Sequence, residues 1–347
     1  MIAIQETRYL IIGGVYKSAT TSLYHYLADH PSVCGSAIKE PRFFLDLDYP
    51  VPSPFRYDAG LDAYGRYFSM CRCGQLRLES APFYLYSPGT AQRIKTALGS
   101  AQQMLFVLRD PIARLRSCFR SESASVQFGG SFDAYVAHWF EELEAAPDHR
   151  DANQIMMGNY SEYLPRYLDV FGQDAVKVVL FEDLVQRPRA ILREVSSFAG
   201  IAPAFYDTYS FRVHNASLEA AFGGQTRLLR AFDRLRLKMT PITIRQPHFH
   251  ASLRWLKQSV AHGLGPSARA AAKGGASPAT LRELEQYYSF EFEALGRLLG
   301  RPLPWPWAAK VAQQPGTTAS PAVDSSPGQA GSFQERRPMH SRELAPR

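Results

Sequence analysis

The chain has few cysteines, and their spacing excludes several classes of protein. Its 347 residues include four cysteines, and Cys71 and Cys73 form a C-x-C pair. This spacing matches neither a C-x-x-C redox motif nor half of a zinc site. So few cysteines in a chain of this length also exclude the disulfide framework of a small secreted domain. We therefore expect free, partly buried thiols in a reducing compartment.

Long apolar runs are missing as well. The sequence has no basic leader followed by an apolar stretch, and no run of about 18 apolar residues. It predicts a soluble, cytoplasmic protein, and hydrophobic and charged contents of 46% and 20% are typical of a globular chain. The net charge of +7 suits anionic ligands. Because zinc-finger spacing and RNA-binding signatures are absent, nucleic acid is not an expected partner.

Strand and helix patterns alternate along the chain. Apolar runs predict strands over 8–13, 103–109 and 176–181, and alternation predicts a short strand over 75–80. Helical spacing predicts helices over 20–29, 112–121, 131–145, 159–171, 188–199 and 277–300. The alternation predicts the α/β class, as a three-layer P-loop-like fold whose central parallel sheet is flanked by helices. We expect this domain to span 1–308, and we expect residues 309–347 to form a disordered tail.

A glycine-rich turn with a lysine, Gly13–Thr21, joins the first predicted strand to the first predicted helix. Main-chain N–H groups at such a helix start converge on an anion, and the helix dipole favours negative charge. Lys17 adds a positive charge, and the hydroxyl side chains that follow it add donors. A Walker A loop has Gly directly before its Lys, whereas Tyr16 precedes Lys17 here. The motif predicts a phosphate site; the alternative is an ordinary capped turn with Lys17 in solvent.

Two further segments should meet this turn. Ser80–Pro82 and Arg109–Asp110 each follow a predicted strand. Ligands of parallel α/β sheets bind beyond the carboxyl ends of the strands, so we expect one crevice to contain all three segments.

Several motifs, in order, resemble sulfotransferases that use 3′-phosphoadenosine 5′-phosphosulfate (PAPS). Ile11–Leu23 resembles their 5′-phosphosulfate loop, and Leu108–Ser117 resembles their 3′-phosphate strand-and-helix motif. Lys39–Phe44 is similar to the E-P-x-F-F segment of the heparan sulfate 3-O-sulfotransferases, and Leu78–Tyr84 to their V-E-K-T-P-x-Y-F. The likeness runs from about 8 to 307 and is closest to the carbohydrate branch, which includes the N-sulfotransferase-like enzymes.

The resemblance implies roles for individual residues. Lys17 would contact the bridging and leaving oxygens of PAPS, and Arg109 and Ser117 would hold its 3′-phosphate. Glu40 matches the catalytic base, and the alternative is a surface carboxylate paired with Lys39 or Arg42. Glu79 and Arg42 are candidate acceptor contacts. The donors around the phosphosulfate would be Lys17, Ser18, Ala19, Thr20, Thr21 and Ser22. No metal is expected, because this transfer depends mainly on positioning and charge.

The chain departs from the family pattern at two places. Ser80 stands where the 3-O-sulfotransferases have a lysine, which removes a cation from the crevice. The late R/K-G-R loop over the 3′-phosphate has no clean match, and Phe222–Arg227 is the candidate replacement. The resemblance therefore does not transfer the acceptor surface.

These observations predict transfer of a sulfuryl group from PAPS to a hydroxyl, or less readily an amine, of a carbohydrate or glycolipid. Glu40 would assist an in-line transfer. The basic segment 225–262 predicts either a solvated face or a peripheral contact with anionic membrane headgroups. Two alternatives stay open: a P-loop kinase, which the missing glycine disfavours, and a non-catalytic relative that binds nucleotide or glycan.

Overall fold

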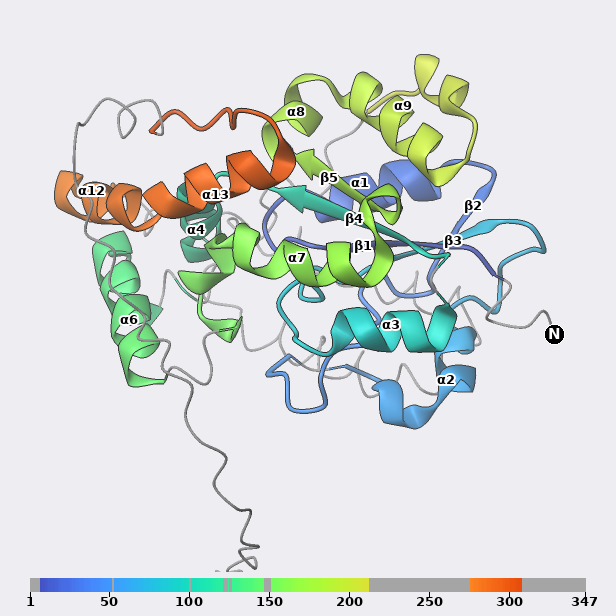
Figure 1. Cartoon of the computed structure of the whole chain (residues 1–347), viewed down its shortest axis with the longest axis horizontal. Coiled ribbons are helices and arrows are strands. Elements are labelled where there is room, and N and C mark those ends of the chain that lie inside the picture. The colour runs from blue at the N-terminus through green and yellow to red at the C-terminus, as the bar shows by residue number, and fades with distance from the viewer. Residues whose placement is uncertain are drawn as a thin grey trace, which may run out of the picture.

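Five parallel strands form the centre of the computed structural model (Figure 1). The structure describes residues 7–51, 53–99, 101–120, 124, 127–146, 151–211 and 275–307. The strands are β1 (Tyr9–Gly14), β2 (Val33–Gly35), β3 (Leu76–Ser80), β4 (Gln103–Leu108) and β5 (Val176–Leu180). Their spatial order is β2-β3-β1-β4-β5, and every neighbouring pair is parallel.

Helices connect these strands and extend the fold beyond them. The helices before β5 are α1 (Thr20–Ala28), α2 (Leu61–Arg66), α3 (Thr90–Leu98), α4 (Pro111–Phe119), α6 (Phe132–Ala145) and α7 (Tyr160–Phe171). Those after β5 are α8 (Phe181–Gln186), α9 (Pro188–Ala199), α12 (Pro278–Tyr287) and α13 (Ser289–Leu299). Short 3-10 turns lie at Tyr57–Ala59, Met156–Gly158, Gln173–Ala175 and Pro203–Asp207.

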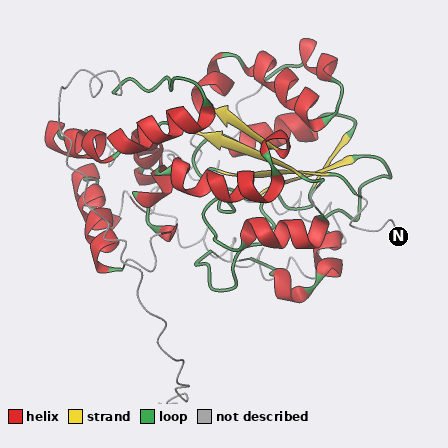
Figure 2. Ribbon diagram, in the orientation of Figure 1, coloured by secondary structure: helices red, strands yellow, loops and turns green. Residues whose placement is uncertain are grey.

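The strands lie between two layers of helices (Figure 2). In β1, Tyr9 and Ile11 belong to one apolar cluster, and Leu10 and Ile12 belong to the other. Helices α1 and α9 cover the second cluster, whereas α3 and α7 pack on the opposite face. Burial on both faces explains why β1 and most of β4 are continuously apolar. The predicted three-layer α/β fold with a parallel sheet is confirmed.

The carboxyl ends of four strands lie at one edge of the sheet. There β1 leads to the turn before α1, β3 ends at Ser80, β4 ends just before Arg109, and β5 leads into α8. Because the strands are parallel, this edge collects the candidate site from separate parts of the sequence.

The sequence pattern missed four elements and joined two helices. It did not predict β2, α2, α3 or α8. The predicted helix 277–300 is two helices, α12 and α13, which meet at Tyr288. That side chain is completely buried, and its hydroxyl donates to the Ile155 carbonyl at 2.7 Å. This contact with a distant segment lies where the chain changes direction, and helical periodicity alone does not reveal it.

The expectation of free thiols is wrong for two of the four cysteines. Cys34 in β2 and Cys71 after α2 form a disulfide with a Cα–Cα distance of 5.6 Å. Cys73 is free and exposed, and Cys118 is free and buried. Composition missed this bond because only the fold brings the two residues together. The thiols therefore no longer support a reducing compartment.

Candidate active site

The turn between β1 and α1 is shaped as an anion cradle. Lys17 and Ala19 have φ angles of 69° and 59°, both in the left-handed region. Alternation of this kind turns successive N–H groups toward a common centre. Ala19 is the N-cap of α1, and no side chain caps that helix. No side chain at the N-cap position therefore competes with an anion for the N–H groups that begin α1.

Two residues near Lys17 in the sequence, Ser18 and Gly13, are tightly enclosed. Ser18 is completely buried, and its Oγ has no hydrogen-bond partner among the described residues. A buried orphan hydroxyl is costly unless something binds it, so the cradle is chemically incomplete without a ligand. Gly13 lies against Phe106 of β4, where an added Cβ would be 2.7 Å from the ring. Glycine is needed there because the Phe106 ring occupies the space that a side chain would fill.

Arg109 lies directly against this turn, as the sequence predicted for two segments at one edge. Its Nη1 donates to the Lys17 carbonyl at 2.9 Å, and its Cζ lies 4.2 Å from the ring centroid of Phe181. Burial lowers the pKa of Arg109, which the nearby Glu182 carboxylate partly opposes. Its Nε is buried and lacks a hydrogen-bond partner in the described part of the chain. The guanidinium is thus held in place by the turn and by the Phe181 ring.

Helix α4 begins immediately after this arginine. Asp110 is its N-cap and accepts hydrogen bonds from the N–H groups of Ile112 and Ala113, at 2.8 and 3.2 Å. Ser117 lies nearly two turns later and is half-buried. The structure therefore places both residues on the β4–α4 unit, with Arg109 at the junction and Ser117 within α4.

The loop from Lys39 to Phe44 crosses the end of β3. The N–H of Ser80 donates to the Lys39 carbonyl at 3.2 Å, and the N–H of Phe44 donates to the Tyr84 hydroxyl at 3.2 Å. Phe43 and Phe44 are completely buried and pack in the core. Both ends of the loop are fixed, so Glu40 is held beside the strand ends.

Glu40 is bonded to two cations. Lys39 Nζ lies 2.8 Å from Oε1, and Arg42 Nη2 lies 2.6 Å from Oε2. Burial acts to raise the pKa of Glu40, but the charges of Lys39 and Arg42 outweigh it and lower that pKa to about 2. The carboxylate is therefore ionised over the whole physiological range and firmly paired.

Glu79 is in the opposite situation. Its side chain is completely buried, and Oε2 accepts a 2.5 Å hydrogen bond from the Tyr64 hydroxyl. Burial raises its pKa to about 7, although hydrogen bonds from Tyr64 and Tyr84 act to lower it. Core tyrosines cover this carboxyl. Glu79 is therefore a buried hydrogen-bond partner of Tyr64, and it is not exposed to contact an acceptor at the surface. The neighbouring Ser80 is also buried, and its Oγ has no partner within the described ranges.

Sequence reasoning missed the aromatic residues that support the site. Tyr160 donates to the Arg109 carbonyl at 2.8 Å, and Trp307 Nε1 donates to Asp110 Oδ1 at 3.1 Å. Tyr16 and Phe83 stack with their ring centroids 5.2 Å apart. Trp307 is separated from Asp110 by 197 residues, so no local pattern signals this contact. In the sequence, Tyr16 directly before Lys17 was the one sign of aromatic residues at the site, and the structure leaves it half-exposed.

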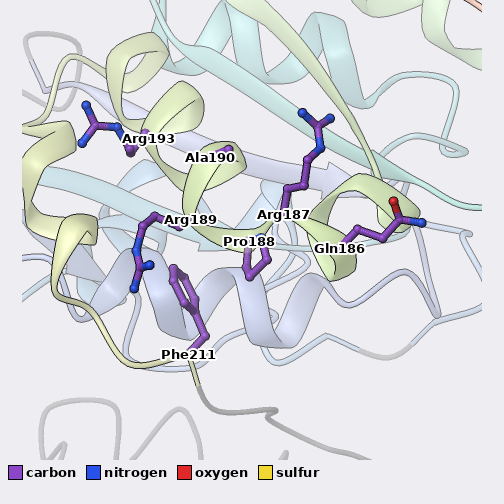
Figure 3. A pocket seen from close by; sticks show the side chains of 7 residues that line it. All are labelled: Gln186, Arg187, Pro188, Arg189, Ala190, Arg193 and Phe211. Carbon is purple, nitrogen blue, oxygen red and sulfur yellow. The ribbon is translucent and has the colours of Figure 1, made fainter.

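A second basic feature lies where α8 meets α9 (Figure 3). It is a surface hollow whose lining includes Arg187, Arg189 and Arg193. Arg187 pairs with Asp183 at 2.9 Å, Arg193 pairs with Asp207, and Arg189 Nε donates to the Tyr206 carbonyl at 2.9 Å. The fold itself thus engages all three guanidinium groups, and we assign no ligand to this hollow.

Comparison with known proteins identifies the class of this fold and site. Residues 8–220 match the model of the sulfotransferase domain, which is more than half of the chain. The chain belongs to the sulfotransferase domain family. Its fold is similar to the crystal structure of a sulfotransferase from Alicyclobacillus acidocaldarius, with a TM-score of 0.57, 22% identity, and coverage of 85% of this chain and 96% of that one.

Curated relatives are similar over parts of the chain. The membrane-associated sulfotransferase kil1 of Dictyostelium discoideum is 33% identical over 107 residues, which is 30% of this chain and 21% of that protein. The bifunctional heparan sulfate N-deacetylase/N-sulfotransferase 4 of Mus musculus is 23% identical over 207 residues, 57% of this chain and 23% of that protein. The human N-deacetylase/N-sulfotransferase 2 is 25% identical over 234 residues, which is 64% of this chain and 25% of that protein. The matches span a quarter or less of these relatives' length.

The expectations about membrane-spanning helices, metal sites and the basic and C-terminal segments can be compared with the described residues only. The helices that the structure describes include none long and apolar enough to cross a bilayer. Within the same residues, no group of three or more metal-ligating side chains is found. The basic segment 225–262, the candidate loop Phe222–Arg227 and the tail 309–347 lie outside the described residues.

Proposed function

We propose that this protein transfers the sulfuryl group of PAPS to a hydroxyl, or less readily an amine, of a carbohydrate or glycolipid acceptor. The observation that carries the proposal is the contact between the two cation-bearing motifs. Arg109 Nη1 donates to the Lys17 carbonyl at 2.9 Å, so both motifs line one edge of the sheet. One nucleotide with phosphates at two positions is a ligand of matching charge.

The chemistry of the cradle fits a phosphosulfate group. The uncapped start of α1, the orphan Ser18 hydroxyl and the Lys17 ammonium are all donors. Thr20, Thr21 and Ser22 continue the donor set along the first turn of α1. Such a cradle stabilises negative charge as it develops on the leaving phosphate oxygen, without reorganising at the moment of reaction.

The 3′-phosphate is assigned to Arg109, with Ser117 further along α4. The Arg109 guanidinium is fixed by the Lys17 carbonyl and by the Phe181 ring, and its buried Nε needs an acceptor. A planar fork of donors that is already oriented loses little entropy when it binds a phosphate. Ser117 would add a hydroxyl donor.

Glu40 is the proposed base. It is held next to the end of β3 because Ser80 bonds to the Lys39 main chain. A carboxylate within reach of the acceptor hydroxyl accepts its proton as the sulfuryl group arrives, which contributes about 10²–10⁴-fold. The names of the N-deacetylase/N-sulfotransferase relatives support a carbohydrate acceptor.

The decisive experiment incubates the purified chain with ³⁵S-labelled PAPS and with separate polysaccharide and glycolipid fractions. We expect label in one of these fractions. Lys17→Ala should lower the transfer rate by about 10²–10³-fold, the usual effect of losing one preorganised donor. Lys177→Ala is the matched control, because Lys177 lies on β5 and pairs with Glu194 at 3.8 Å. Equal rates for both variants would contradict the role of Lys17.

Binding is measured separately by calorimetry with adenosine 3′,5′-bisphosphate. Arg109→Ala should weaken binding by about 10–100-fold, because a charge-assisted hydrogen bond contributes about 1.5–3 kcal/mol. Unchanged affinity would remove Arg109 from the site. If nucleotide binds and no fraction gains label, the non-catalytic alternative is favoured. Turnover of ATP with magnesium would instead favour the kinase alternative.

A further inference from the structure

Both carboxylate oxygens of the proposed base are already engaged. Lys39 holds Oε1 at 2.8 Å, and Arg42 holds Oε2 at 2.6 Å. The three side chains are only 18–28% exposed. A carboxylate in this state is a poor proton acceptor, since each oxygen is bonded to a cation. Loss of one of the two contacts would therefore make Glu40 a stronger base toward a substrate hydroxyl.

Arg42 is the partner placed to move onto a substrate. Its Cζ lies 5.9 Å from the ring centroid of Phe83, and Phe83 stacks on Tyr16 at an interplanar angle of 26°. At the other end of this aromatic pair, Lys17 Nζ lies 4.9 Å from the Tyr16 ring centroid. The pair thus connects the phosphosulfate cradle to the Arg42–Glu40 ion pair. Both rings are half-exposed, so a substrate can reach them.

The backbone also distinguishes Arg42 from Lys39. Arg42 has a φ of 56°, a left-handed conformation that a non-glycine residue rarely adopts. Such conformations persist where the surrounding structure enforces them, and they occur often at binding sites. Lys39, by contrast, is tied through its carbonyl to Ser80. An arginine fork also donates two parallel hydrogen bonds to a carboxylate or sulfate, which a lysine does not.

We propose that an anionic group on the acceptor, a carboxylate or a sulfate, takes over the Arg42 guanidinium and thereby releases Oε2 of Glu40 to act as the base. This inference rests on the proposed function. It makes the acceptor's own charge promote catalysis: a neutral acceptor leaves Arg42 on Glu40, and the carboxylate stays a weak base. Lys39 remains on Oε1 and keeps the carboxylate in position.

The transfer then balances in one step. The acceptor oxygen forms a bond to sulfur while the bond between sulfur and the bridging phosphate oxygen breaks. That electron pair stays on the phosphate oxygen, beside Lys17. The acceptor proton moves to Oε2 of Glu40. The products are a sulfate ester, adenosine 3′,5′-bisphosphate and a protonated Glu40 that later returns its proton to water.

The test compares an oligosaccharide that contains uronic acid with its carboxyl-reduced counterpart, at saturating PAPS. For the unmodified chain we expect kcat to be at least about tenfold higher with the acidic form, a fraction of the usual contribution of general base catalysis. In Arg42→Gln the ratio of the two kcat values should fall to about 1, because Glu40 is no longer held. The kcat for the reduced oligosaccharide should rise. Arg42→Lys should restore part of the preference.

Binding gives a readout that does not depend on turnover. With adenosine 3′,5′-bisphosphate present, Arg42→Gln should weaken binding of the acidic oligosaccharide by about tenfold, or about 1.4 kcal/mol, and leave the reduced form unaffected. Arg66→Gln is the control, since it removes an exposed arginine at the end of α2. It should change neither quantity.

The outcomes separate this inference from the function on which it rests. Label transfer with equal kcat values for the acidic and reduced forms in the unmodified chain overturns the inference and leaves the function standing. A parallel loss of activity toward both forms in Arg42→Gln also overturns it. Bound nucleotide without label on any acceptor overturns the function and the inference together.

Discussion

Two glutamates near the end of β3 show how strongly the surroundings of a residue decide its chemistry. Glu40 lies between two cations, and its pKa falls to about 2. Glu79 is completely buried, and burial raises its pKa to about 7. Pairs of carboxyls whose surroundings separate their pKa values in this way are typical of acid–base sites. Here the paired carboxylate is the accessible one.

Replacement of Glu79 by glutamine should change the pH dependence of stability. The carboxyl has a pKa of about 7 in the folded chain and an ordinary value of 4.5. Between these values the folded state binds more protons than the unfolded state, so the free energy of unfolding falls as pH rises. The effect is about 3 kcal/mol at most. Urea unfolding at pH 4.5 and pH 8 should show Glu79→Gln losing less stability than the unmodified chain.

The amide of the variant keeps an oxygen that can accept from the Tyr64 hydroxyl. The comparison therefore isolates the ionisation. Identical slopes against pH for the two proteins would mean that Glu79 is not protonated in the folded state near neutral pH.

At the scale of secondary structure, the start of α4 is the most connected element of the site. Asp110 caps the helix, its N–H donates to Glu182 Oε1 at 3.1 Å, and its Oδ1 accepts from Trp307. The preceding Arg109 carbonyl accepts from Tyr160. Contacts from α8, α7 and the segment after α13 thus converge on two consecutive residues. They anchor the main chain from which the Arg109 side chain extends.

Loss of this cap should weaken nucleotide binding as well as stability. Asp110→Ala should lower the free energy of unfolding by about 1–2 kcal/mol. Because Trp307 then loses its acceptor and Arg109 its support, the affinity for adenosine 3′,5′-bisphosphate should fall several-fold. Calorimetry and urea unfolding measure the two effects.

A matched control is available in α6. Ser131 caps that helix by accepting from the Ala134 N–H at 3.1 Å, and Ser131→Ala removes the cap. It should lower stability and leave nucleotide affinity unchanged. If both variants weakened binding equally, the effect of Asp110→Ala would be a general loss of stability.

For the molecule as a whole, the Cys34–Cys71 disulfide closes the segment that contains the Lys39–Phe44 loop and Tyr64. The two cysteines are 37 residues apart in the sequence. Tyr64 packs on Phe43 and Phe44, with ring centroids 5.1 and 4.8 Å apart. The bond therefore links β2 to the region after α2 and encloses the segment that positions Glu40.

Removal of the disulfide should destabilise the fold. For a loop of this length, a cross-link contributes about 3–4 kcal/mol through the entropy of the unfolded chain. We expect Cys34→Ser with Cys71→Ser to lose about 2–4 kcal/mol in urea unfolding under non-reducing conditions. Cys73→Ser is the control, since Cys73 is free and exposed. If the unmodified chain gave the same midpoint with and without a reductant, the bond would contribute nothing.

Much of the fold could be predicted because its signals are local. The apolar runs of β1, β4 and β5 were visible, and the predicted helices 131–145 and 188–199 correspond to α6 and α9. β2 was missed because three residues are too few to show a pattern. The split at Tyr288 was missed because its partner, Ile155, lies 133 residues away.

In the candidate site, too, the features within short motifs were predictable, and the contacts between distant residues were not. Lys17, Arg109 and Glu40 stand in short motifs, and their residue types indicate anion binding and proton transfer. The predicted parallel sheet places Lys17 and Arg109 at the same edge, and the hydrogen bond between them agrees with this placement. The pairing of both Glu40 oxygens, the burial of Glu79 and the contact of Trp307 with Asp110 could not be read from any motif.

The sequence alone determined the parallel α/β architecture and the kinds of residue at the strand ends, because hydrophobic periodicity and turn chemistry act over a few residues. Tertiary structure alone decided the charge state of each glutamate, the disulfide and the aromatic support of Arg109. These depend on which distant groups come within a few ångströms, and on how much water the assembled core excludes. Distances and solvent exclusion are properties of the packed chain, and a linear order of residues does not contain them.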